Sequence, residues 1–302
     1  MQIQSASSIR GTIHLPGDKS ISHRYAVLAA MATGNTTILN FSNSQDCKST
    51  LNCLQKIGVE IHRQKNELKI QSRGWKKFQQ PTQILNAGNS GTTIRFLSAL
   101  LSGSPFNSTI QGDSSLNLRP MERIIVPLSQ MGASIEAHKK EYPPLHIKGA
   151  SLKGINYRLP LASAQVKSCL LLAGLMAHGQ TTIEETTSTR NHTELALPFF
   201  NTSFTQKNGR MTISGQTSLT PVQAKIPGDF SAAAFFILSA ILVPNSEICL
   251  ANVGINPSRT ALLDLLEQAG LHLEKTNIRL SNSEPTCDLT IRYTPSLLEK
   301  FP

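Results

Sequence analysis

One pattern recurs four times along the chain: a helix start, a run of small and apolar residues, a Gly or Asn break, and then a β-branched strand. The breaks fall at Gly34, Gly103, Gly179 and Asn245. Each copy continues into a second amphipathic helix and a hairpin. The sequence therefore predicts a β-α-β-α-β-β unit of about 70 residues, used four times. The alternative is chance periodicity in an ordinary α/β protein, but all four copies keep the same order of elements.

The repeat also predicts how the chain divides. The first strand, within residues 1–16, is expected to pair with the later domain, because the first copy already holds its own strands. The domain border is expected near Val222–Gly228. This gives one complete three-unit domain over residues 20–221, and a partial second domain from residues 1–19 and 222–302. In the fourth copy a helix over Ala261–Ala269 is expected to precede a hairpin of Leu271–Glu274 and Ile278–Leu280.

All four predicted first helices open with short polar residues. If the copies are related by rotation, the amino ends of these helices gather at one surface. Helix dipoles and free backbone N–H groups attract anions there, without any metal. The four openings are Ser20–Ser22, Asn89–Thr92, Ser163–Gln165 and Gly228–Ser231.

The first opening lies in the segment P-G-D-K-S-I-S-H-R, residues 16–24. Asp18 and Ser20 are candidate N-caps of the helix that follows. Lys19, Ser20 and Arg24 then fall on or beside its first turn, where two cations and a hydroxyl suit a phosphate or a carboxylate. The alternative is a capped surface helix with ordinary basic residues.

Arginines stand near the starts of the copies, and a guanidinium group binds phosphate or carboxylate bidentately. For any single arginine, a surface position or an ion pair is the alternative. His23 and His192 are candidates for proton transfer, with a hydrogen-bonded structural histidine as the alternative. The arginines are Arg24, Arg95, Arg119, Arg123 and Arg190.

The net charge of +10 raises the question of nucleic-acid binding. Aromatic residues make up only 5% of the chain, and no run of five basic residues occurs. Because stacking aromatics are scarce, a cleft for a small polyanion is favoured over nucleic acid. The sequence also lacks G-x-S-x-G, G-x-G-x-x-G and Walker A patterns, which argues against a serine hydrolase and the common nucleotide folds.

Cysteine usage and apolar runs indicate the compartment. The five cysteines are scattered, form no C-x-x-C pair, and suit a reducing cytosol rather than a disulfide framework or a zinc site. The amino terminus lacks the layout of a signal peptide. The longest apolar run, Ala232–Val243, is too short to span a bilayer. We therefore expect a soluble cytoplasmic protein that does not contact membranes.

Seven segments, in order along almost the whole chain, resemble the motifs of the 5-enolpyruvylshikimate-3-phosphate synthase (3-phosphoshikimate 1-carboxyvinyltransferase) family. The resemblance implies two domains of three β-α-β-α-β-β units each, an inside-out α/β barrel. It also implies transfer of the enolpyruvyl group of phosphoenolpyruvate to the 5-hydroxyl of shikimate 3-phosphate, with release of phosphate and no cofactor. The segments are P-G-D-K-S-I-S-H-R, G-N-S-G-T-T-I-R, L-R-P-M, A-S-A-Q-V-K-S, T-R-N-H-T-E, P-G-D-F-S-A-A-A-F-F and N-V-G-I-N-P-S-R-T.

Matched motif by motif, the resemblance assigns the substrate contacts. Lys19 would contact both substrates and take part in proton transfer, and Gln165 would lie between them. The residues implied for shikimate 3-phosphate are Lys19, Ser20, Arg24, Ser163, Ala164 through its backbone, Gln165 and Arg190. Those implied for phosphoenolpyruvate are Lys19, Asn89, Gly91, Thr92, Arg119 and Gln165.

The chain also departs from the family pattern. It supplies four of the six units and stops at Lys300–Pro302, before the family's catalytic aspartate and its later basic residues. We therefore expect weak turnover or none, and self-association through the incomplete domain. The alternatives are an inactive fragment or pseudoenzyme that still binds shikimate 3-phosphate, and a UDP-N-acetylglucosamine enolpyruvyl transferase. That second enzyme shares the architecture, but its motifs match less well.

Overall fold

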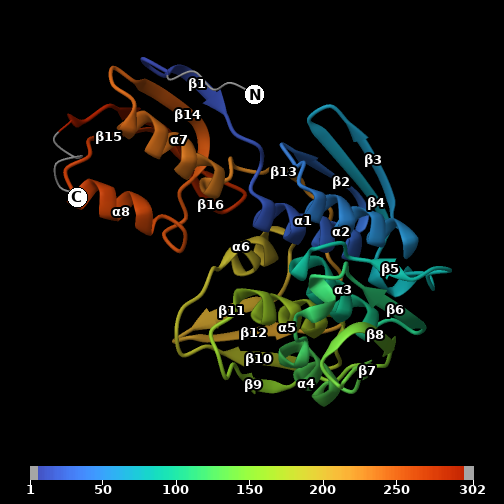
Figure 1. The fold of residues 1–302 in the computed structure, drawn as a ribbon. Helices are drawn as coiled ribbons and strands as arrows, with labels where there is room; N and C mark the ends of the chain where they lie inside the picture. The colour runs from blue at the N-terminus through green and yellow to red at the C-terminus, as the bar shows by residue number, and fades with distance from the viewer. Residues whose placement is uncertain (1–5, 296–302) are drawn as a thin grey trace. The chain divides into compact units, whose positions relative to one another are not determined.

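The computed structural model describes residues 6–295 (Figure 1). Residues 1–5 of the predicted first strand, and the predicted stop at Lys300–Pro302, lie outside the described residues. Contacts divide the chain into two compact units. The larger unit consists of Lys19–Leu39 and Asn43–Ala224, and the smaller unit of the described residues up to Asp18, Asn40–Ser42 and those from Lys225 onward.

The order β-α-β-α-β-β occurs four times in the described chain, which confirms the predicted repeat. The first copy has β1 (Arg10–His14), α1 (Lys19–Met31), β2 (Thr33–Leu39), α2 (Gln45–Lys56), β3 (Glu60–Gln64) and β4 (Glu67–Arg73). The second has β5 (Leu85–Asn86), α3 (Gly91–Ser102), β6 (Asn107–Gln111), α4 (Glu122–Gln130), β7 (Ser134–His138) and β8 (Tyr142–Lys148). The third has β9 (Asn156–Arg158), α5 (Ala164–Met176), β10 (Gln180–Glu184), α6 (His192–Phe199), β11 (Phe204–Lys207) and β12 (Arg210–Ser214).

Each of these copies builds a four-stranded sheet that is antiparallel except at one edge. In the second and third copies the short first strand lies parallel to the next one, β5 beside β6 and β9 beside β10. In the first copy that edge is taken by β13 (Gln223–Lys225), from the fourth copy. The orders are β13-β2-β4-β3, β5-β6-β8-β7 and β11-β12-β10-β9.

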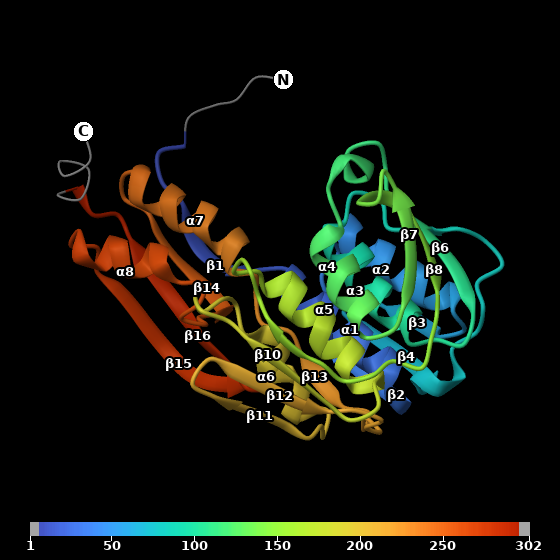
Figure 2. The same cartoon turned by 90° about the horizontal axis from the view of Figure 1, so that it is seen from below.

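The helices α1, α3 and α5 form the centre of the larger unit and lie side by side (Figure 2). The residues of α1 from Ile21 to Met31 and those of α5 from Val166 to Met176 are all buried. Small and apolar side chains around the whole circumference suit a helix that other elements surround on every side. These helices begin at Lys19, Gly91 and Ala164, the three segments predicted to form the site.

The smaller unit holds the rest of the fourth copy. Its strand β1 pairs in parallel with β14, from Arg10 opposite Glu247 to His14 opposite Ala251, which confirms that the first strand joins the last copy. The two helices cover one face of the sheet β1-β14-β16-β15 (Figure 2). The elements are α7 (Phe230–Leu242), β14 (Glu247–Gly254), α8 (Ala261–Gln268), β15 (Leu273–Ser281) and β16 (Glu284–Arg292).

The hairpin predicted for the fourth copy is wrong. A single strand, β15, runs through both predicted strands and pairs with β16. Asn277 has a positive φ of 51°, but it lies in a bulge between Thr276 and Arg279 rather than in a turn. The turn comes later, at Asn282 and Ser283, whose φ values of 50° and 68° suit a two-residue hairpin loop.

Two properties of the described residues bear on partners. Within residues 6–295 no helix combines the length and the apolar character needed to cross a membrane. On α7, Phe235 is 76% exposed and Leu242 is 60% exposed, although Phe230 and Ile237 on the same helix are buried. The predicted self-association through this unit stays a prediction.

Candidate functional site

Lys19 is the first residue of α1, and its ammonium group meets a carboxylate. Nζ lies 2.8 Å from Oδ2 of Asp46, in the first turn of α2, and the Lys19 side chain is 48% exposed. Ser20 lies inside the first turn of α1, so of the two predicted caps only Asp18 stands at the residue before the helix. Sequence reasoning missed Asp46, because an acidic residue at a helix start indicates only a favourable helix dipole.

The start of α3 lies under two guanidinium groups. Ser90 is the N-cap and Gly91 the first residue of this helix. Arg95 Nη1 donates to the carbonyl oxygen of Gly91 at 3.0 Å. A Cβ atom on Gly91 would lie 2.6 Å from Arg95 Nη1 and 3.9 Å from Arg119 Nη1. Burial lowers the pKa of Arg95, and the nearby positive charges of Arg119 and Arg123 lower it further. Three predicted arginines therefore share this region.

Asn89 is held in place by two charged neighbours. Its amide nitrogen donates to Asp113 Oδ2 at 2.8 Å and Oδ1 at 3.0 Å. Its oxygen accepts from Arg119 Nη2 at 2.8 Å. Asp113 also accepts from the backbone N–H of Leu116 at 2.8 Å, and this bond, with that from Asn89, holds the pKa of Asp113 below its usual range. Asp113, which sequence reasoning missed, thus orients Asn89 and, through Asn89, the guanidinium group of Arg119.

The start of α5 is bonded to the start of α3. Ser163 is the N-cap of α5, and its hydroxyl accepts from the N–H of Val166 at 3.4 Å. Gln165 Nε2 donates to Thr92 Oγ1 at 2.9 Å. Ala164 lies between these two residues as the first residue of the helix. Ser163, Ala164 and Gln165 are therefore brought to the same place as Thr92.

Arg24 ties three helices together. Its Nη1 donates to the carbonyl oxygen of Ser20 at 2.8 Å, its Nη2 to Ser168 Oγ on α5 at 2.9 Å, and its Nε to Thr193 Oγ1 on α6 at 2.7 Å. Arg24 is only 4% exposed. Arg190 lies exposed in the loop before α6.

The starts of α1, α3 and α5 are thus linked by contacts among the predicted site residues and their neighbours, and Arg190 lies in the loop before α6. Lys19 is paired with Asp46, and the backbone oxygen of Asp46 accepts from Thr93 Oγ1 on α3 at 3.2 Å. The fourth predicted opening, at the start of α7, belongs to the smaller unit. Within residues 6–295 no group of three or more His, Cys, Asp or Glu side chains could hold a metal ion. The amino-terminal ends of the helices, the arginines and Lys19 are suited to binding anions.

A model of the EPSP synthase (3-phosphoshikimate 1-carboxyvinyltransferase) family matches residues 3–298. The chain belongs to this family. Relatives named 3-phosphoshikimate 1-carboxyvinyltransferase include one from Solibacter usitatus, 45% identical over 293 residues, which are 97% of this chain and 69% of the relative. Another, from Bacillus subtilis, is 44% identical over 292 residues, which are 96% of this chain and 68% of the relative.

A solved structure of EPSP synthase from Acinetobacter baumannii superposes with a TM-score of 0.89 at 41% identity, over 94% of this chain and 65% of that one. The predicted family and α/β fold class are confirmed. The chain spans about two thirds of the length of the EPSP synthases that it matches.

His23, in the family segment P-G-D-K-S-I-S-H-R, does not have the environment of a proton-transfer group. It is 1% exposed, and its Nδ1 lies 2.7 Å from Thr50 Oγ1. Burial lowers the pKa of His23 from 6.5 to about 3; Asp46 opposes this shift, and Arg24 and Lys19 reinforce it. His23 is therefore neutral at neutral pH, and the structural alternative considered for it is the better one.

The buried imidazole makes stability depend on pH. An unfolded histidine binds a proton near its ordinary pKa of 6.5, whereas native His23 stays neutral down to about 3, so acid favours the unfolded chain. Above pH 6.5 the protonation of His23 does not lower the free energy of unfolding. As the pH falls from 6.5 toward 3, it lowers that free energy by up to about 1.4 kcal/mol per pH unit. Urea unfolding across this range measures the decline. The variant His23→Gln is expected to show a shallower slope, and an equal slope would contradict the assignment.

A lysine is buried behind the start of α5. Lys167, in the family segment A-S-A-Q-V-K-S, has a side chain that is 0% exposed. Its Nζ lies 2.9 Å from Glu185 Oε1, 3.0 Å from Glu185 Oε2 and 2.6 Å from Glu194 Oε1. Both glutamates are less than 5% exposed, so two carboxylates share one cation inside the protein. The triad holds α5, the segment after β10, and α6 together.

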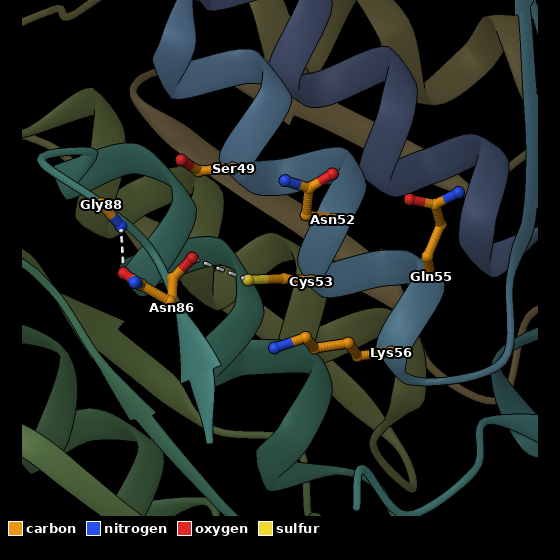
Figure 3. A pocket seen from close by; sticks show the side chains of 7 residues that line it. All are labelled: Ser49, Asn52, Cys53, Gln55, Lys56, Asn86 and Gly88. Atoms are coloured by element: carbon orange, nitrogen blue, oxygen red, sulfur yellow. Dashed lines mark hydrogen bonds between the residues drawn. The ribbon is translucent and has the colours of Figure 1, made fainter. Parts of the chain in front are cut away.

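A pocket of about 520 Å³ lies between α2 and the segment after β5, outside the predicted site (Figure 3). The only cation among its lining residues is Lys56, and the others are polar or neutral. A substrate with several phosphate and carboxylate groups needs more cations than this pocket offers. The helix starts, where several cations gather, are therefore the better candidate for the functional site. The lining residues are Ser49, Asn52, Cys53, Gln55, Lys56, Asn86 and Gly88.

Proposed function

We propose that this chain binds shikimate 3-phosphate and phosphoenolpyruvate at the starts of α1, α3 and α5, and transfers the enolpyruvyl group to the 5-hydroxyl of shikimate 3-phosphate. In this proposal residues 20–221 form one three-unit domain, and residues 1–19 and 222–302 form part of a second. Shikimate 3-phosphate lies against Lys19, Ser20, Arg24, Ser163, Ala164, Gln165 and Arg190. Phosphoenolpyruvate lies against Lys19, Asn89, Gly91, Thr92, Arg119 and Gln165.

The observation that carries this proposal is the convergence of Arg95 and Arg119 over Gly91, at a helix start whose Thr92 is bonded to Gln165 of the next helix. The two substrates carry two phosphates and two carboxylates, which are costly to remove from water without partners. Backbone N–H groups fixed at helix starts, with arginines whose positions are set by other contacts, stabilise such charge without reorganising during the reaction.

The proposed reaction is balanced by the groups present. The 5-hydroxyl oxygen forms a bond to C2 of phosphoenolpyruvate and loses its proton, the bond between C2 and the phosphate oxygen breaks, and the departing phosphate takes up a proton, so that hydrogen phosphate leaves. Lys19 is the candidate to move the proton, because it is half-exposed at the start of α1 and its ammonium group is aligned by Asp46.

A second candidate function is binding of shikimate 3-phosphate without turnover. It is supported by the same contacts at the helix starts, which would hold an anion whether or not a reaction follows. Both candidates predict binding of shikimate 3-phosphate by the larger unit, so the two are separated by turnover and not by affinity.

Calorimetric titration of the full chain with shikimate 3-phosphate tests the proposal. The variant Lys19→Met is expected to weaken binding by about tenfold or more, because a charge-assisted hydrogen bond contributes roughly 1.5–3 kcal/mol. The matched control is Lys207→Met, since Lys207 is exposed on β11. Release of inorganic phosphate from a mixture of both substrates measures turnover.

Each outcome has a distinct meaning. Binding with phosphate release supports the transferase, and binding without it supports the second candidate. Tight binding of UDP-N-acetylglucosamine in place of shikimate 3-phosphate would favour the related enzyme considered from the sequence. The proposed site is wrong if neither ligand binds. It is also wrong if Lys19→Met and Lys207→Met both bind shikimate 3-phosphate as tightly as the wild type does.

A further inference from the structure

Four buried polar side chains form a continuous row beneath the helix starts. His23 Nδ1 on α1 lies 2.7 Å from Thr50 Oγ1 on α2, and Thr50 Oγ1 lies 2.7 Å from Thr93 Oγ1 on α3. The Thr93 hydroxyl donates to Ser90 Oγ at 2.7 Å. None of the four residues is more than 1% exposed. The row thus joins three helices in a region without access to water.

The number of protons in this row fixes its direction. Each threonine hydroxyl has one proton, and that of Thr93 is directed at Ser90 Oγ at 2.7 Å and at the backbone oxygen of Asp46 at 3.2 Å, so it is not available to Thr50. The 2.7 Å contact between the two threonines therefore needs the proton of Thr50. Thr50 then has none left for His23, so their contact requires a proton on Nδ1 of the ring.

The other neutral tautomer of His23 fails on two counts. With the proton on Nε2, the hydroxyl of Thr50 would have to donate both to His23 Nδ1 and to Thr93 Oγ1. It has one proton, so one of these two 2.7 Å contacts would lack a hydrogen. In addition Nε2 is buried, with no hydrogen-bond partner among residues 6–295. A buried N–H group without an acceptor costs free energy that an unprotonated ring nitrogen in the same place largely avoids.

We propose that His23 is a positioning residue: as the Nδ1–H tautomer it begins a one-way hydrogen-bond chain through Thr50 and Thr93 to Ser90, and this chain fixes the start of α3 against α1 and α2. The consequence for ligand binding rests on the proposed function, in which the start of α3 binds phosphoenolpyruvate.

Two members of the hydrogen-bond chain, Ser90 and Thr93, lie beside both halves of the site. Ser90 is the N-cap of α3, and its hydroxyl also accepts from the N–H of Thr93 at 3.1 Å, directly behind Gly91. The Thr93 hydroxyl lies 3.2 Å from the backbone oxygen of Asp46, whose carboxylate pairs with Lys19. Displacing Thr93 therefore changes the distance between the anion-binding end of α3 and the lysine.

Nitrogen NMR of the histidine-labelled full chain tests the tautomer without any ligand. Wild-type His23 is expected to carry its proton on Nδ1. Observation of the Nε2–H tautomer would overturn the proposal. In Thr50→Val the ring loses its acceptor, and the tautomer is expected to become mixed.

Binding and exchange measurements test the positioning role. Thr93→Val and Thr50→Val are expected to weaken phosphoenolpyruvate binding by about three- to tenfold and to leave shikimate 3-phosphate binding within about twofold. Thr181→Val is the matched control, because Thr181 is 0% exposed and its hydroxyl has no hydrogen-bond partner among the described residues. Equal losses in control and test variants would overturn the proposal.

A third measurement separates this inference from the proposed function. Hydrogen exchange of the amide at position 93, which donates to Ser90, is expected to be faster in Thr50→Val than in Thr181→Val. If the wild type binds no phosphoenolpyruvate, the proposed function fails. The tautomer of His23 and the exchange rates still decide whether the hydrogen-bond chain from His23 to Ser90 exists. Unchanged exchange in Thr50→Val would show that the chain does not position α3.

Discussion

Replacing Lys167 with methionine is expected to lower the free energy of unfolding by about 3–5 kcal/mol. Methionine has nearly the length of the lysine stem, so the packing of this side chain against its neighbours is largely kept. The substitution removes the only cation that contacts Glu185 and Glu194 in the described structure, at 2.9 Å and 2.6 Å. Two carboxylates would then lie buried without a compensating cation, and urea unfolding at neutral pH measures the loss.

Two controls distinguish the cost of leaving a buried carboxylate without its cation from the cost of lost side-chain packing. Lys69→Met makes the same change in a 3.1 Å pair with Glu67 whose side chains are 64% and 38% exposed, and is expected to cost less than about 1 kcal/mol. The triple variant with Lys167→Met, Glu185→Gln and Glu194→Gln carries no charge at these three positions and is expected to recover most of the stability. A loss that the triple variant does not recover would point to packing.

Lys167 also shows which contacts could not be predicted from the sequence. A lysine in a run of apolar residues on a predicted helix has no neighbour in sequence that explains it. Its partners lie 18 and 27 positions further on, after a strand and a loop. Only the tertiary fold, which brings the segment after β10 and the start of α6 to Lys167 on α5, puts these groups together. Asp46 and Asp113 were missed for the same reason, because each gains its role from a residue of another element.

The parts that the sequence did predict depend on local patterns. The order of elements in each copy follows from helical and strand periodicity and from Gly or Asn breaks, and the helix starts follow from short polar residues. The pairing of β1 with β14 followed from counting strands in the first copy. The hairpin of the fourth copy failed because Asn277 adopts positive φ inside a bulge, a conformation that suits a turn equally well. Local preference does not distinguish the two; the register against β16 does.

Arg24→Lys is expected to weaken binding of shikimate 3-phosphate by about 100-fold and to destabilise the larger unit by on the order of 3 kcal/mol. The guanidinium group of Arg24 donates to the Ser20 carbonyl, to Ser168 and to Thr193 at 2.7–2.9 Å, and it lies over the ring of Phe96 at 5.2 Å. A lysine ammonium is a single point and reaches one of these acceptors, so the others lose a charge-assisted bond.

The two effects of Arg24→Lys need separate measurements, because a destabilised protein binds less when part of it is unfolded. Calorimetric titration is therefore made well below the melting temperature of the variant, and circular dichroism confirms that the chain is folded. Arg73→Lys, at an exposed position on β4, is the matched control and is expected to leave both quantities unchanged. If folded Arg24→Lys binds shikimate 3-phosphate as tightly as the wild type, Arg24 only joins α1, α5 and α6. The phosphate must then be held by the helix starts and the other basic side chains.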